Sequence, residues 1–223
     1  MRFIAFEKVI PQINKLSLPG LETQLKMAPS FRENLLERFK EAQKSAKLAA
    51  VLALFYPSGT GETNLVLILR KVYKGIHSAQ VGFPGGKPEI DDASLLDTAL
   101  RETWEEIGLD LSRHARHLGE LDQIRVRPRG RNIDMVVTPV LYVLESEPAM
   151  LNPNHEVADI LWGSLDEMYS GSSRTEEVFH VGGQSQTFPG YSVGEQVVWG
   201  LTMRMLEQFF TMLNPEFEAE QNW

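Results

Sequence analysis

The sequence contains no cysteine and carries little positive charge, and each absence excludes a class of site. Without cysteine the chain cannot form disulfides or thiolate metal centres. Its 22 lysines and arginines are outnumbered by 30 aspartates and glutamates, giving a formal net charge of −8. This balance argues against broad binding to a nucleic-acid backbone, although one local basic patch could still hold a small anionic ligand. The lack of cysteine also fits a reducing cytoplasm, where we place the protein.

Long hydrophobic runs are absent as well. The longest apolar run, residues 48–56, is far too short to span a bilayer. The first fifteen residues contain neither a long apolar stretch nor a small-residue cleavage site, so we expect no signal peptide and no membrane partner. With 43% hydrophobic residues in a chain of 223, the composition supports one sizeable domain with an ordinary core.

Hydrophobic periodicity and turn residues predict a mixed α/β domain. We expect an N-terminal helical arm over residues 1–46, a domain over 47–213 and a tail over 214–223. Helices are expected at 3–14, 31–46, 94–108, 164–170 and 195–213. Strands are expected at 47–57, 63–71, 116–124 and 133–145, with a short strand within 72–86 and a hairpin near 175–192. The segment 154–160 is expected to be a loop that could supply an extra acid, Glu156 or Asp159.

The helix over 94–108 concentrates negative charge. Ser94 with Asp97 three residues on is typical of a helix N-terminus, and Gly108 supplies the C-terminal stop. Glu102, Glu105 and Glu106 lie on roughly one helix face, where like charges repel by about 0.2–0.5 kcal/mol per pair. One alternative is a solvated acidic face. The other is a cation site, and carboxylates without cysteine or histidine suit Mg²⁺ or Mn²⁺ rather than zinc.

The chain from Gly86 to Leu109 resembles the signature box of the Nudix hydrolases, G-x5-E-x7-R-E-U-x-E-E-x-G-U, in which U is apolar. Gly86 is followed by five residues and Asp92, and then by eight residues and "RETWEEIGL". Asp92 stands in place of the first glutamate, Ala93 is one extra residue, and Thr103 stands at the first apolar position. The resemblance implies an α/β/α sandwich around a mixed sheet, and a metal-dependent hydrolase of nucleoside diphosphates linked to a further group.

A second resemblance concerns the substrate. The stretch "VLILRKVYKGIHSAQVGFPGG", residues 66–86, is similar to the motif L-L-T-x-R-[SA]-x3-R-x3-G-x3-F-P-G-G of coenzyme A pyrophosphatases in this family. The segments "VVTPVL" at 136–141 and "VVWGLT" at 197–202 also look like that subfamily. The matching positions of the motif are Leu67, Arg70, Phe83, Pro84, Gly85 and Gly86. The positions that differ are Ile68, Lys71, Gly75 and Ala79.

The resemblance implies a role for each site residue. Glu102, Glu105 and Glu106 would hold Mg²⁺ or Mn²⁺, with Glu102 and Glu106 as the surest pair. Glu102, Glu105 and Arg101 are the predicted catalytic residues, Arg101 by fixing the carboxylates. The predicted substrate-binding residues are Arg70, Gly85, Gly86, Arg125 and Arg127.

The arginine-rich loop, residues 125–131, is the densest basic patch in the chain. It is either a solvated hairpin tip or a clamp for phosphates, which arginine binds through two parallel hydrogen bonds. The leading prediction of function is hydrolysis of coenzyme A or its thioesters. The alternatives are another Nudix substrate, such as ADP-ribose or a dinucleotide, and a Nudix-fold binding module without catalysis. The expected partner is a small nucleotide, and a homodimer is left open.

Overall fold

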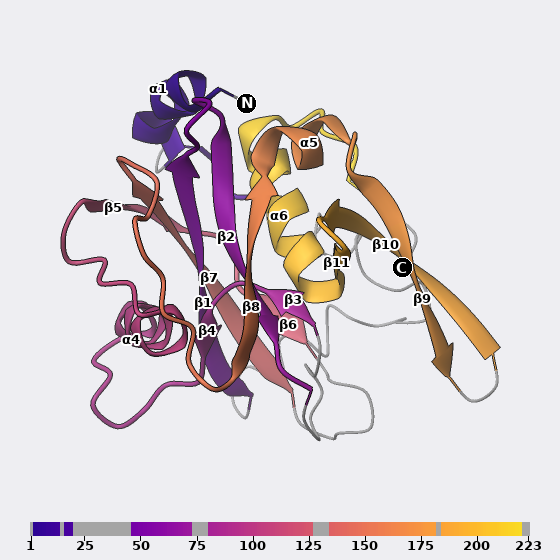
Figure 1. Cartoon of the computed structure of the whole chain (residues 1–223), viewed down its shortest axis with the longest axis horizontal. Coiled ribbons are helices and arrows are strands. Elements are labelled where there is room, and N and C mark those ends of the chain that lie inside the picture. The colour runs from indigo at the N-terminus through magenta and orange to yellow at the C-terminus, as the bar shows by residue number, and fades with distance from the viewer. Residues whose placement is uncertain are drawn as a thin grey trace.

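A computed structural model describes residues 2–13, 16–19, 46–72, 80–126, 134–181 and 184–219. A mixed sheet runs through the centre, and a smaller antiparallel sheet lies beside it (Figure 1). The helices are α1 (Phe3–Ile13), α4 (Leu95–Ile107), α5 (Leu165–Ser170) and α6 (Gly200–Leu213). The strands of the central sheet are β1 (Lys47–Pro57), β2 (Thr63–Arg70), β3 (Val81–Gly82), β4 (Gly85–Gly86), β5 (Ala115–Glu120), β6 (Ile124–Val126), β7 (Met135–Leu144) and β8 (Val157–Ser164). The smaller sheet contains β9 (Arg174–Val181), β10 (Gln184–Val193) and β11 (Gln196–Trp199).

Strand β1 is the centre of the large sheet and is buried on both faces. It pairs with β7 in parallel along most of its length and with β2 antiparallel at the predicted hairpin. Successive side chains of a strand point to opposite faces. Leu52 and Leu54 therefore join the core on one face, whereas Ala53 and Phe55 join the core on the other. This alternation explains why residues 47–57 read as one nearly continuous apolar run.

Strands β1 and β2 pair only near their hairpin and then separate. Their last paired residues are Phe55 and Leu65; beyond them, β1 pairs with β4 and β2 pairs with β3. The segment 81–86 thus fills the gap between the two strands. The amide of Leu52 also donates to the Pro84 carbonyl at 2.9 Å, which fixes the intervening turn.

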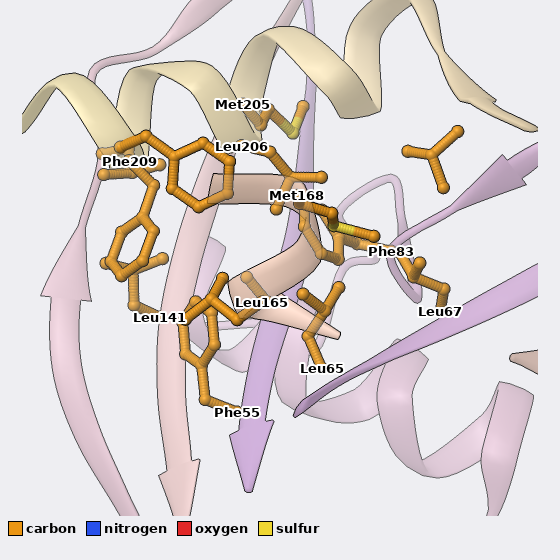
Figure 2. Close-up of a cluster of buried hydrophobic side chains, with 14 of the residues drawn as sticks. Phe55, Leu65, Leu67, Phe83, Leu141, Leu165, Met168, Met205, Leu206 and Phe209 are labelled. Atoms are coloured by element: carbon orange, nitrogen blue, oxygen red, sulfur yellow. The ribbon is translucent and has the colours of Figure 1, made fainter. Parts of the chain in front are cut away.

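Helices cover both faces of the central sheet, as the predicted sandwich requires (Figure 1). Helix α4 packs Ala99 and Ile107 against one face, and α6 covers the other. Figure 2 shows α6 presenting Leu206 and Phe209 to side chains from β1, β2 and β7. The α/β fold class is therefore confirmed.

Helix α1 packs its apolar face into the same core as α6. Phe6 is fully buried, and its ring centroid lies 5.1 Å from that of Phe55 and 6.3 Å from that of Phe209. At the other end of the chain, Phe217 stacks on Tyr169 at 5.6 Å. The division into arm, domain and tail stays a prediction, and the predicted helix at 31–46 falls outside the described residues apart from residue 46.

Three predicted elements differ from the structure. Residues 157–164 form strand β8 rather than part of a loop, because they pair with β2 along its length. Helix α6 begins at Gly200 rather than near Glu195, because residues 196–199 pair with β10. The predicted strand at 116–124 is divided into β5 and β6, which pair with different parts of β7.

In the described part of the chain, no helix combines the length and the apolar character needed to cross a bilayer.

We predict that Phe6→Ala lowers the free energy of unfolding by about 3–5 kcal/mol, because it leaves a cavity among buried aromatic rings. Urea denaturation measures the change. Ile4→Ala is the matched control on the same helix, since Ile4 is 70% exposed. Equal, small losses in both variants would show that α1 does not belong to the cooperative folding unit.

Candidate active site

Helix α4 carries the acidic cluster, which consists of Glu102, Glu105 and Glu106, and both ends of the helix are fixed. The Ser94 hydroxyl accepts a hydrogen bond from the amide of Asp97 at 3.2 Å, and Gly108 adopts a left-handed conformation with φ of 70°. Beyond the helix, the carbonyls of Glu106 and Ile107 accept from the amides of Asn154 and Asn152. These bonds satisfy groups that a helix C-terminus otherwise leaves unpaired. The predicted helix and both of its end signals are confirmed.

Gly85 and Gly86 lie directly beneath this helix because β4 pairs with β1. Gly85 has a φ of 149°, and a Cβ there would overlap the Ala50 carbonyl. A Cβ on Gly86 would overlap the carboxylate of Glu102. Gly85 therefore needs glycine because of the backbone of β1, and Gly86 lets the Glu102 carboxylate lie where it does.

Glu106 is the most deeply buried acid of the cluster, with only 2% of its side chain exposed. Its Oε1 accepts from Nη1 of Arg70 at 2.6 Å, and its Oε2 accepts from the Gly85 amide at 2.8 Å. Burial raises the pKa of Glu106 above its ordinary value, while Arg70 and the Gly85 amide oppose that shift. Through these bonds, Glu106 near the end of α4 is linked both to Arg70 at the end of β2 and to Gly85 of the glycine pair.

Glu102 lies one helical turn before Glu106, and its carboxylate lies against Gly86. Burial raises the pKa of Glu102, and Arg101 opposes the shift. The negative charge of Glu102 contributes to the raised pKa of Glu106, and that of Glu105 contributes to the raised pKa of Glu102. Glu105 differs from both, because its side chain is 48% exposed and accepts from Arg101 at 3.1 Å.

The donor set fits a hard divalent cation. Two part-buried carboxylates that repel each other face a glycine loop, and carboxylate oxygens are ligands that Mg²⁺ and Mn²⁺ prefer. Within the described ranges, no three Asp, Glu or His side chains already form a group that could hold a metal ion. The structure thus brings Glu102 and Glu106 to the glycine loop, whereas it turns Glu105 toward Arg101.

The comparisons with known proteins give the family. The profile of the NUDIX domain matches residues 46–180. The chain belongs to the Nudix hydrolases. Members of this family are pyrophosphohydrolases, so the predicted class of enzyme is confirmed.

Several curated Nudix relatives match most of the domain. The mitochondrial coenzyme A diphosphatase NUDT8 of Mus musculus is 34% identical over 146 residues, covering 64% of this chain and 67% of the relative. The uncharacterized Nudix hydrolase NudL of Yersinia enterocolitica is 30% identical over 154 residues, covering 69% of this chain and 75% of the relative. Among solved structures, the MutT protein from Methanosarcina mazei Go1 has a TM-score of 0.49 and 16% identity, covering 77% of this chain and 97% of that chain.

Arg101 organises the outer side of the Nudix box. Its Nε and Nη2 donate to the two oxygens of Asp92 at 3.0 and 2.9 Å, and Nη2 also donates to the Lys87 carbonyl. Its Nη1 lies 3.1 Å from Glu105 and 3.3 Å from Glu102. This guanidinium holds the pKa of Asp92 well below the ordinary range. Asp92 therefore serves as the partner of Arg101 in the box.

The remaining predicted residues fall in different places. Arg70 points at Glu106. Arg125 donates to Asp134 at 2.7 Å, and Arg127 lies outside the described residues. Asp159 is on strand β8, where its side chain accepts from the amide of Ile160. Asp134 was missed from sequence, although an acid just across the predicted loop from Arg125 is the signal that could have indicated the pair.

A separate cavity of about 690 Å³ lies beside α4. Trp104, His117 and Tyr142 line it, together with Arg101. Trp104 is 56% exposed, and the rings of His117 and Tyr142 lie 5.2 Å apart. None of the three glutamates of the box lines this cavity, so it is distinct from the cluster that faces the glycine loop.

We predict that Gly86→Ala lowers kcat/KM by about 100-fold, because the added methyl group must displace the Glu102 carboxylate and small displacements at a reacting centre have effects of this size. Steady-state hydrolysis with Mg²⁺ measures the loss, and circular dichroism checks the fold. Gly59→Ala is the control, since the nearest atom to its Cβ is 3.9 Å away. Full activity of the Gly86→Ala protein would mean that Glu102 has no fixed role.

Proposed function

We propose that the chain hydrolyses the diphosphate of coenzyme A or acyl-coenzyme A. The products would be adenosine 3′,5′-bisphosphate and 4′-phosphopantetheine or its acylated form. The observation that carries the proposal is the pair of carboxylates facing Gly85 and Gly86, the buried Glu106 and the part-buried Glu102. The choice of substrate is supported by the likeness to the mouse coenzyme A diphosphatase and by the partial motif at 66–86.

The proposed chemistry divides between a divalent cation and the protein. Nudix hydrolases generally use Mg²⁺ or Mn²⁺, and a bound cation would neutralise the diphosphate and lower the pKa of water. Glu102 and Glu106 would hold it. Glu105, which is the most exposed of the three acids, is available to take a proton from the attacking water. Arg101 would keep Glu102 and Glu105 in place through its contacts with both.

The glycine pair would shape the site, and the arginine-rich loop would bind the phosphates of the substrate. Without side chains, Gly85 and Gly86 let their backbone lie close to β1 and to the Glu102 carboxylate of the proposed cation site. Arg125 donates to Asp134 through Nη2. Arg127 would contact a phosphate, and Arg125 would do so by exchanging Asp134 for the phosphate. Cytoplasmic location also stays a prediction, since the mouse relative is named as mitochondrial.

We expect cleavage of coenzyme A in a screen with Mg²⁺ and Mn²⁺ that also contains ADP-ribose, NADH and diadenosine polyphosphates. Chromatography of the digest identifies the products. The Glu106→Gln protein is the control for contaminating hydrolases and should be inactive, because it loses a carboxylate of the cation site. Brisk cleavage of ADP-ribose without cleavage of coenzyme A would favour the rival substrate. No cleavage of any compound would favour a binding module.

We predict that Arg127→Ala lowers kcat/KM for coenzyme A by roughly 10- to 100-fold, the effect of losing one charged hydrogen bond to phosphate. The measurement compares coenzyme A with 3′-dephospho-coenzyme A. A larger loss on coenzyme A would assign Arg127 to the 3′-phosphate, and equal losses would assign it to the diphosphate. Unchanged rates on both substrates, for Arg125→Ala as well, would contradict a phosphate-binding role of the loop.

A further inference from the structure

Arg70 lies at the end of strand β2, where the backbone is fixed on both sides. Its amide donates to the Gln80 carbonyl at 3.1 Å, beside β3, and it pairs with Val157 of β8 on the other side. The register with β8 shifts between Leu69 and Arg70, because the residue between Val157 and Asp159 has no partner on β2; this irregularity resembles a β-bulge. Bulges of this kind aim a side chain and are frequent beside active sites.

The side chain of Arg70 continues the row of Val66 and Ile68, which faces α4. From there Nη1 donates to Oε1 of Glu106 at 2.6 Å, and Nη2 donates to the Gly85 carbonyl at 2.9 Å. One guanidinium therefore binds both an acid of the box and the loop beneath it. The Gly85 amide holds the other oxygen of Glu106, so the three groups form a closed ring of hydrogen bonds.

Two arginines thus divide the carboxylates of the cluster. Arg101 binds Asp92 and Glu105 on the outer side of α4, and Arg70 binds Glu106 on the inner side. Glu102 lies 3.3 Å from Nη1 of Arg101, and the charges of both arginines oppose the rise of its pKa. Within the part of the chain that the structure describes, loss of Arg70 would leave the buried carboxylate of Glu106 with the Gly85 amide as its hydrogen-bond partner.

We propose that Arg70 is a positioning residue for Glu106 and the Gly85 carbonyl, and not a contact for the substrate's phosphates. Both terminal nitrogens of its guanidinium donate to protein groups, and only 19% of its side chain is exposed. An arginine that grips phosphate presents those same nitrogens to the ligand. This inference rests on the proposed function of the site, and it revises the substrate-binding role implied by the motif at 66–86.

The kinetic test separates turnover from substrate binding. For whichever diphosphate the wild type cleaves, Arg70→Ala should lower kcat by about 100-fold, because Glu106 loses its fixed geometry, while KM stays within about threefold. Arg70→Lys should restore only part of kcat. A lysine ammonium can pair with Glu106, but it cannot also bind the Gly85 carbonyl in the forked arrangement of a guanidinium. Lys71→Ala is the matched control, because Lys71 is exposed and uses its backbone amide to bind Glu156. A tenfold rise in KM with kcat retained would overturn the proposal in favour of a phosphate contact.

Thermal unfolding of the metal-free protein provides a readout that does not depend on activity. Arg70→Ala should lower the melting temperature by about 6–20 °C, because it leaves the buried Glu106 carboxylate without the guanidinium that pairs with it. The same substitution in the Glu106→Gln background should cost much less, since no buried charge is left. Equal shifts in the two backgrounds would contradict the pairing. If Arg70→Ala does not fold, the Arg70→Lys and Arg70→Gln proteins make the same comparison.

The two experiments keep this inference apart from the proposed substrate. If the wild type cleaves ADP-ribose but not coenzyme A, the proposed substrate is wrong. The role of Arg70 is then tested by measuring kcat and KM with ADP-ribose. A wild type that cleaves nothing refutes the proposed function. The unfolding measurements still decide in that case whether Arg70 fixes Glu106.

Discussion

The separation of strands β1 and β2 is the feature on which the rest of the site depends. Strands that part inside a sheet leave backbone groups unpaired, and each such buried group costs about 1–3 kcal/mol. The segment 81–86 supplies the missing partners, to β2 through Val81 and Gly82 and to β1 through the glycine pair. The loop is therefore part of the sheet, and this placement gives α4 a rigid surface of backbone to face.

Burial at that surface explains the arrangement of charge on α4. Acids exposed on a helix can share a face at small cost, but an acid pressed against backbone loses water and needs partners. Glu106 obtains them from the Gly85 amide and Arg70, whereas the more exposed Glu105 needs only Arg101. The three glutamates that look equivalent in the sequence thus differ in burial and in partners. That difference separates those suited to hold a cation from the one suited to exchange protons with water.

Local signals accounted for much of the fold and part of the site. The N-cap at Ser94, the stop at Gly108 and the turn between β1 and β2 are all contained in short stretches, so their elements were predicted closely. Strand β8 was missed because it lies at an edge, carries Asp159 and is specified by pairing with β2, which is distant in sequence. Likewise, the spacing within α4 predicted that Glu102 and Glu106 share a face, but no spacing could predict that Arg70, 36 residues earlier, binds Glu106.

The departures from the Nudix signature have a physical explanation in the contacts of Asp92. Aspartate is one methylene shorter than glutamate, and the extra residue Ala93 lengthens the loop that joins Asp92 to the helix. Together these changes leave a carboxylate that meets Arg101 with both oxygens and also accepts from the Thr98 hydroxyl at 2.9 Å. In this chain, Asp92 thus ties the loop before the helix to Arg101 and Thr98 of α4. The constraint on Gly85 is stricter, because a side chain there would meet the backbone of β1, whereas one on Gly86 would displace the Glu102 carboxylate from its present position.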